Sequence, residues 1–259
     1  MIGAWICLAS TSGRGKRSQS TTMKKRPELY AWTLLWLGVA TFEAAPGNSG
    51  TQPMPVSRAN LCVTEGTIEE LPGGRLSVSV PKMRAYVNVA TTQVVEAKFT
   101  YLGSTGNQAR LGSGELRRQF GLKLRAEDAC NLIYAMWRIE PESKLVVSVK
   151  SNPGQHTSAE CGNRGYRNIK PGRSAPIPVL RSGEIHTLRA EMNGAEMILF
   201  VDSSPVWEGF TGPDVLGFDG PVGIRSDNAR LQIELRVGEP LRTRSGNPPS
   251  CRRGAAESE

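Results

Sequence analysis

Aromatic residues, cysteines and histidines are scarce in this 259-residue chain: aromatics make up 6% of it, with five Cys and two His. No two cysteines have the short spacing of a zinc knuckle, and only His156 and His186 could assist them, which argues against a zinc site. The sequence also lacks a G-x-S-x-G elbow, a phosphate-binding glycine loop and the paired-carboxylate strand motif of a retaining glycosidase. These absences argue against three large enzyme classes. Trp137 and Trp207 lie in strand-like runs where we expect burial, which weakens a lectin that stacks sugars on tryptophan.

Helical periodicity of useful length is absent too, and short runs rich in Val, Ile and Thr between turn residues take its place. Eleven runs predict strands, at 75–80, 85–90, 94–102, 115–126, 131–139, 144–150, 186–192, 195–202, 205–209, 220–226 and 231–237. Asn193-Gly194 between two of them is a strong hairpin signal. The pattern predicts an all-β protein, a two-sheet antiparallel β-sandwich of jelly-roll type.

The N-terminal region is expected to lie outside that fold. Met23 precedes three basic residues and the apolar run LYAWTLLWLGVA, which is short for a membrane span but suits a signal peptide. We expect a leader at 1–45 with cleavage near 40–46, and a secreted or periplasmic protein that has no membrane contact after cleavage. An uncleaved anchor is the alternative, and the start codon is Met1 or Met23. A linker at 46–60, a jelly-roll domain at 61–239 and a flexible tail at 240–259 follow.

Charge argues against a nucleic-acid partner. The whole chain carries a net charge of +8, but removing residues 1–45 takes away six Lys/Arg and two Asp/Glu and leaves about +4. Much of the basicity therefore belongs to the leader and the tail, and no basic stripe for nucleic acid remains.

Four cysteines follow the leader, Cys62, Cys130, Cys161 and Cys251. An even count in an exported chain predicts disulfides, and four cysteines allow three connectivities. Cys130 and Cys161 flank two successive predicted strands, so we pair them and expect the other two to tie the ends of the domain together.

The predicted strand at 115–126 has one polar face. Phe120, Leu122 and Leu124 alternate with a second set, Arg117, Gln119, Lys123 and Arg125. One interpretation is a solvated edge strand kept soluble by charge. The other is a groove, because Tyr134 and Arg138 share a face of the next strand and a long polar loop at 151–173 carries His156 and Tyr166. A groove of this kind would suit an anionic or hydroxyl-rich ligand, with Gln119, Lys123 and Arg125 pointing into it and Arg117, Arg138, Lys150 and His156 as substrate-binding candidates.

Four segments carry a resemblance to a known family: RRQFGLKLRAEDACNLIYAMWRIEP, VVSVKSNPG, AECGNRGY and GPVGIRSDNARLQIEL. In motif order, roughly residues 60–238 resemble the secreted β-jelly-roll family of glucuronan lyases and fungal cellulose-induced proteins, with their bacterial relatives. The segment GPVGIRSDN also resembles the last strands of lectin-like and laminin-G-like sandwiches.

The resemblance implies β-elimination of a uronic-acid polysaccharide, which needs a group to neutralise the carboxylate, a base at C5 and an acid for the leaving oxygen. Arg125 and Gln119 are the candidates for neutralising the carboxylate. Lys123, Tyr134 and Tyr166 are the acid and base candidates, and nearby cations would depress the pKa of Lys123. Tyr134 as a core tyrosine and His156 as an ordinary loop residue are the alternatives.

Related jelly rolls often carry a structural calcium ion, and Asp227 with Glu65 could hold one here. The alternative is that residues 226–228 are only a polar turn.

Three function classes therefore remain: a lyase acting on a polyuronate, a non-catalytic carbohydrate-binding module on the same sandwich, and an envelope protein without a ligand. In the first two the partner is a polysaccharide, anionic in character, and we expect a monomer.

Overall fold

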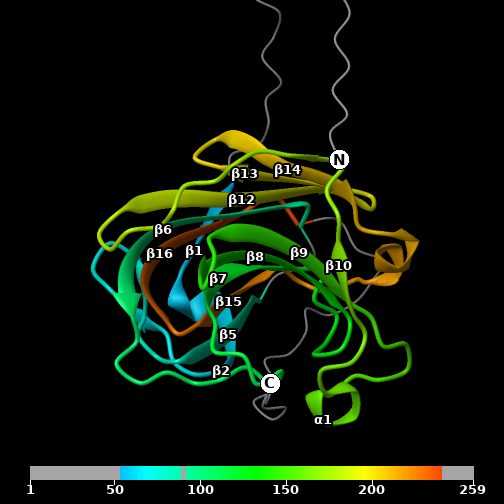
Figure 1. Cartoon of the computed structure of the whole chain (residues 1–259), viewed down its shortest axis with the longest axis horizontal. Helices are drawn as coiled ribbons and strands as arrows, with labels where there is room; N and C mark the ends of the chain where they lie inside the picture. The colour runs from blue at the N-terminus through cyan, green and yellow to red at the C-terminus, as the bar shows by residue number, and fades with distance from the viewer. Residues whose placement is uncertain (1–52, 89–91, 241–259) are drawn as a thin grey trace, which may run out of the picture. The chain divides into compact units, whose positions relative to one another are not determined.

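The computed structural model describes residues 53–88 and 92–240, which all belong to one compact unit. The regular structure of the described chain is almost entirely β-strand, in two antiparallel sheets that lie one over the other (Figure 1). The two-sheet antiparallel sandwich predicted from the sequence is confirmed.

Sheet A has nine strands. In spatial order they are β11 (Arg173–Ser174), β14 (Ser204–Phe210), β13 (Glu196–Val201), β12 (Ile185–Asn193), β6 (Val94–Ser104), β16 (Ala229–Val237), β4 (Leu76–Val78) and β3 (Glu69–Glu70), with β1 (Met54–Val56) also paired to β16.

Sheet B has seven strands and carries the site described below. In order they are β10 (Tyr166–Ile169), β9 (Lys144–Lys150), β8 (Leu132–Glu140), β7 (Arg118–Leu124), β15 (Gly223–Asp227), β5 (Lys82–Val87) and β2 (Leu61–Glu65). The helical elements of the described chain are short: η1 (Arg58–Asn60), α1 (Ser158–Cys161) and η2 (Pro213–Gly217).

All eleven predicted strands are present, and the hairpin predicted at Asn193-Gly194 joins β12 to β13. Two expectations were wrong. The range 46–60, expected as a linker, contains β1, which pairs with β16, and η1. The loop at 151–173, expected to have no regular structure, contains α1 and β10, and β10 extends sheet B beyond β9. β1 has three residues and β10 has four, which is too short a run for apolar alternation to reveal them.

The core lies between the sheets. On β7 the inward residues are Phe120, Leu122 and Leu124, as predicted, and Phe120 packs against Phe99 of sheet A at 4.9 Å between ring centroids. Trp137 is also in this core and fully buried. Because side chains alternate along a strand, the remaining residues of these strands project from the other side of sheet B, called here the outer face.

Strand register brings the polar residues of the outer face together. Gln119 lies opposite Asp227 on one side and opposite Arg138 on the other. In the next row Gly121 lies between Arg225 and Met136. A Cβ at Gly121 would come within 2.3 Å of the Ala135 carbonyl oxygen, so only glycine fits there. Its missing side chain leaves room for Met136.

Candidate ligand site on sheet B

A hollow of about 340 Å³ lies on the outer face of sheet B. It is lined by residues of β7, β8, β9, β10 and β15 and by the loop before β7. Its polar and charged lining includes Glu115, Arg117, Gln119, Tyr134, Arg138, Ser148, Asn163, Tyr166, Asn168 and Arg225. The predicted groove therefore has a counterpart in the fold, although only part of the predicted residue set lines it.

A buried carboxylate organises the floor of this site. Asp227 is fully buried, and its Oδ1 accepts a hydrogen bond from Arg84 Nη2 at 2.7 Å. Its Oδ2 accepts hydrogen bonds from Arg225 Nε at 2.9 Å and from Gln119 Nε2 at 2.7 Å. Burial alone would favour the neutral acid, but the attraction of Arg225 and Arg84 and the Gln119 amide outweigh it. The pKa of Asp227 therefore lies well below its usual range, and the group is a carboxylate at every physiological pH.

The carboxylate fixes the polarity of Gln119. An ionised carboxylate only accepts hydrogen bonds, so Gln119 must turn its Nε2 donor toward Asp227. Its Oε1 is then left as an acceptor, and this atom is buried without a hydrogen-bond partner among the described residues. Gln119 is 3% exposed and lines the hollow. A buried acceptor without a partner is costly, so Oε1 would gain from any hydrogen-bond donor that reached it.

Three arginines line the hollow. The pKa of Arg117 is lowered by burial first and then by repulsion from Arg138 and Arg225. Burial also lowers the pKa of Arg138, an effect that Glu142 partly offsets. Arg117 pairs with Glu115, whereas the buried Nε of Arg138 has no hydrogen-bond partner in the described part of the chain. Mutual repulsion between partly desolvated cations favours the arrival of an anion.

Tyrosine rings lie against the cations of the outer face. Tyr134 and Tyr166 are stacked, with centroids 6.1 Å apart. Arg225 lies 5.1 Å above the ring of Tyr134, and Lys150 lies 5.1 Å above the ring of Tyr166. Tyr134 is buried, as its core interpretation requires, and still lines the hollow, while Tyr166 is 39% exposed at its rim.

Several predicted residues lie elsewhere. Lys123 and Lys150 are on the outer face but fully buried, and neither lines the hollow; Lys123 lies 3.9 Å from the ring centre of Tyr86. The position expected for Arg125 was wrong. Arg125 follows the end of β7 with a φ of 48°, which breaks the alternation, and donates to the carbonyls of Gly194 and Val215. It therefore binds the β12–β13 turn and η2, away from Gln119.

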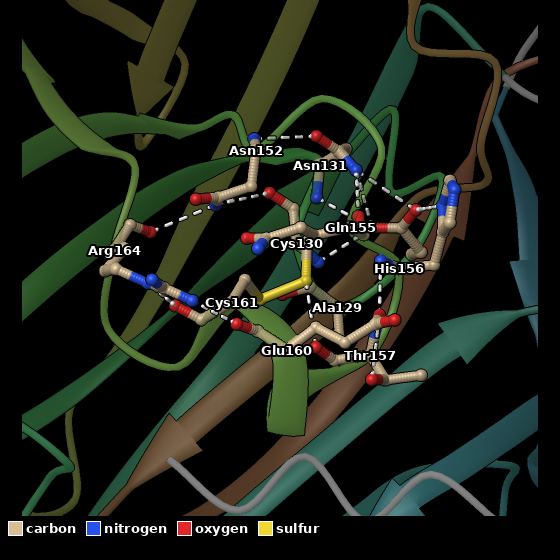
Figure 2. Close-up of a disulfide and its surroundings, with 11 residues drawn as sticks. Ala129, Cys130, Asn131, Asn152, Gln155, His156, Thr157, Glu160, Cys161 and Arg164 are labelled. Atoms are coloured by element: carbon tan, nitrogen blue, oxygen red, sulfur yellow. Dashed lines mark hydrogen bonds and ion pairs between the residues drawn. A yellow bond between two sulfur atoms is a disulfide. The ribbon is translucent and has the colours of Figure 1, made fainter.

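The predicted bridge between Cys130 and Cys161 is confirmed, with the two Cα atoms 5.9 Å apart. Figure 2 shows that it ties α1 to the turn before β8, where Asn131 and Asn152 are linked by a hydrogen bond. Cys62 is also disulfide-bonded, while Cys251, its predicted partner, lies outside the described residues.

His156 belongs to this disulfide region and not to the hollow. Its Nδ1 is 2.7 Å from Asp128 Oδ2. Its backbone N–H donates to Glu160, which lies beside it in Figure 2. The hydrogen bond and the charge of Asp128 raise the pKa of His156. These contacts fix the chain just before the start of α1. They fit the alternative interpretation of His156 as an ordinary polar loop residue.

The residues proposed for calcium do not fit that ion. Both oxygens of Asp227 are engaged by guanidinium and amide donors, and Glu65 lies 3.8 Å from Arg84, a cation. Within 53–88 and 92–240, no group of three or more His, Cys, Asp or Glu side chains could hold a metal ion. A cation would have to displace two arginines from a fully buried position.

Sequence reasoning did not single out Arg84 and Arg225. Both could have been found from strand alternation. Arg84 lies between the apolar residues Met83 and Ala85 and so faces away from the core, and Arg225 is two residues from Asp227 and so shares its face. The sequence analysis interpreted Asp227 as part of a turn or as a calcium ligand. Neither interpretation predicts cations on the neighbouring strands.

A scan of the sequence against protein-family models found no match, and a search of curated proteins found none either. Solved structures with a similar fold include the carbohydrate-binding module CBM66 from Bacillus subtilis, at 14% identity and a TM-score of 0.49 over 71% of this chain and 97% of that one. The metal-free carbohydrate recognition domain of Emp46p has 14% identity and a TM-score of 0.45, over 71% and 89% of the two chains. The galectin LEC-6 from Caenorhabditis elegans has 10% identity and a TM-score of 0.38, over 71% and 99%. These likenesses are too distant to assign a ligand, and they give the resemblance to glucuronan lyases no specific support.

None of the helices in the described residues has the length and apolar character that a membrane crossing requires.

Proposed function

We propose that the hollow on sheet B binds an acidic polysaccharide, with a uronate residue as the recognised unit. The observation that carries this proposal is the buried, unpartnered Oε1 of Gln119 beside arginines. A uronate offers both groups that the site calls for, because its carboxylate pairs with guanidinium groups and its hydroxyls donate hydrogen bonds.

The anionic part of the proposal rests on Arg138 and Arg117. Arg138 makes no ion pair with any described residue, and the one counter-charge on the hollow's lining, Glu115, is already paired with Arg117. A sulfate or chloride ion would satisfy these cations but would bring no donor for Gln119. A neutral sugar would satisfy Gln119 but leave the cations unmatched.

Binding without turnover is the form of this function that the geometry supports better. Elimination needs a base within reach of C5–H. Lys123, the base expected from the family resemblance, is fully buried and does not line the hollow, and Arg125 is engaged at the far end of β7. Tyr134 and Tyr166 do line it, so a lyase activity remains the second candidate, to be tested on the same ligands.

The proposal includes export to an oxidising compartment, where the protein acts as a monomer on extracellular or periplasmic polymer. The Cys130–Cys161 bridge supports that location, since such bonds persist outside the reducing cytosol.

Titration calorimetry over polyglucuronate, polygalacturonate, alginate and a neutral glucan tests the proposal. We expect binding of at least one polyuronate that weakens as salt rises, and no binding of the glucan. Arg138→Ala should weaken binding about 10- to 100-fold, the scale of a lost charged hydrogen bond, while Arg236→Ala on sheet A removes the same charge and should change little. Equal binding of neutral and acidic polymers would contradict the proposal. Ultraviolet absorbance of the unsaturated product, recorded in parallel, would reveal elimination.

A further inference from the structure

A second hollow of about 440 Å³ adjoins the first. The two share Arg138, Val146 and Asn168 in their linings, so they adjoin at these residues, and together they are called here the groove. Their linings extend from the outer face of sheet B past β9 and β10, which lie side by side in Figure 1, to β11 and β14 at the edge of sheet A. Each hollow falls within the roughly 300–1,000 Å³ typical of small-ligand sites.

The two hollows differ in charge. Arg138 and Lys144 are the charged residues that line the second one, and Lys144 is already paired with Glu142. Its lining combines the apolar residues Leu145, Ile169, Pro176, Ile177, Val206 and Trp207 with the uncharged polar residues Ser143, Asn168 and Ser174. Val206 and Trp207 belong to the main core, and Leu145, Ile169 and Ile177 pack against it, so this lining is continuous with the core of the sandwich.

Arg138 marks the boundary between the two. It lines both hollows, and its buried Nε has no partner among the described residues. A carboxylate bound by Arg138 from the first hollow would leave the second for the adjacent sugar. A second carboxylate placed against the apolar residues of this lining would lose its hydration without gaining an unpaired cation, which is unfavourable.

We infer that the groove binds an acidic heteropolysaccharide in which the uronate is followed by an uncharged sugar residue, held in the second hollow. This inference rests on the proposed function and adds to it a second subsite and its chemistry. An N-acetyl or O-acetyl group on the uncharged sugar would suit this lining, because its methyl can pack on apolar side chains while its polar atoms face Ser174 and Asn168.

The experiment compares three ligands by NMR titration, which detects binding at millimolar dissociation constants: glucuronate, a glucuronate dimer, and a disaccharide of glucuronate and N-acetylglucosamine. We expect the mixed disaccharide to bind at least 10-fold more tightly than glucuronate. The glucuronate dimer should bind less than 3-fold more tightly than glucuronate. Ser174→Trp, designed to fill the second hollow, should lower the affinity for the mixed disaccharide to that for glucuronate. The affinity for glucuronate itself should not change. Leu216→Trp, a matched change at an exposed residue of η2, should alter neither.

The outcomes separate the inference from the proposed function. If glucuronate binds but the mixed disaccharide binds no more tightly, the second subsite is refuted and the uronate site stands. If the dimer gains as much as the mixed disaccharide, the uncharged character of the second subsite is refuted. If none of the three binds, the proposed function falls and the inference with it.

Discussion

Replacing Asp227 with Asn should destabilise the domain strongly, because it removes the one carboxylate at the centre of the buried cations. Arg84 is fully buried and the Arg225 side chain is 6% exposed, so both would keep their charge without this counter-charge. Breaking a buried pair by removing one partner costs about 3–5 kcal/mol. For a domain of this size that corresponds to a fall in melting temperature of roughly 6–20 °C.

The effect should depend on pH in a defined direction. Arg225 and Arg84 hold the pKa of folded Asp227 below its unfolded value of about 3.9, so its stabilisation is complete above that value. As the pH falls below about 4 the unfolded chain takes up the proton first, and the stabilisation is lost as the pH approaches the folded pKa. The gap in unfolding free energy between wild type and Asp227→Asn should be constant from pH 5 to 7 and narrow below pH 4.

Urea unfolding at several pH values measures this gap, with Asp202→Asn as the control. Asp202 is a partly exposed carboxylate at the β13–β14 turn whose charged contact is His186, so its loss should cost far less. A loss below 1 kcal/mol for Asp227→Asn at pH 7, or a gap that does not change between pH 5 and pH 3, would refute the reasoning about the buried network.

Three further changes test separate parts of the structure. Gln119→Met removes the amide at similar size and should weaken uronate binding about 5- to 30-fold, as calorimetry would show; unchanged affinity would exclude Gln119 from the site. Arg125→Ala should lower stability by about 1–3 kcal/mol in urea unfolding, because the Gly194 and Val215 carbonyls lose a donor, and should leave uronate affinity unchanged; a binding defect in the folded variant would restore the role expected from the sequence. Replacing both Cys130 and Cys161 with Ser should cost about 2–4 kcal/mol, the scale for a closed loop of this length, and a loss below 0.5 kcal/mol would contradict it.

Much of sheet B could be predicted because apolar alternation is a long-range signal in a sandwich. Phe120, Leu122 and Leu124 had to face the core, so Gln119 and Lys123 had to face away from it, and the structure agrees. The same rule failed one residue later. Arg125 adopts a positive φ just beyond β7. After the apolar Leu124, strand alternation expects a polar residue, so the polar Arg125 gives no sign that the strand has ended.

Burial on the outer face was harder to foresee. Charged residues at alternate positions of a strand normally indicate a face exposed to solvent. Lys123, Lys150 and Arg84 are nevertheless fully buried. For Arg84 the partner comes from a strand distant in sequence: Arg84 is in β5 and its carboxylate partner Asp227 is in β15. Pairing of that kind depends on strand order, which a single sequence does not specify.

The charge of Asp227 also determines what kind of ligand group the site can recognise. As long as residue 227 is a carboxylate it can only accept, so Gln119 turns Nε2 toward it and keeps Oε1 as an acceptor, and under the proposed function the ligand group that reaches Oε1 must be a donor. An Asn at this position could donate to Gln119 Oε1 instead, and the glutamine would then turn its Nε2 toward the ligand. Gln119 would then donate a hydrogen bond to a ligand oxygen instead of accepting one from a ligand hydroxyl. The arginines proposed to attract the ligand's carboxylate would remain. Under the proposed function, selectivity for a hydroxyl beside an anion, rather than for anions alone, would therefore depend on Asp227, a buried residue that does not line the hollow.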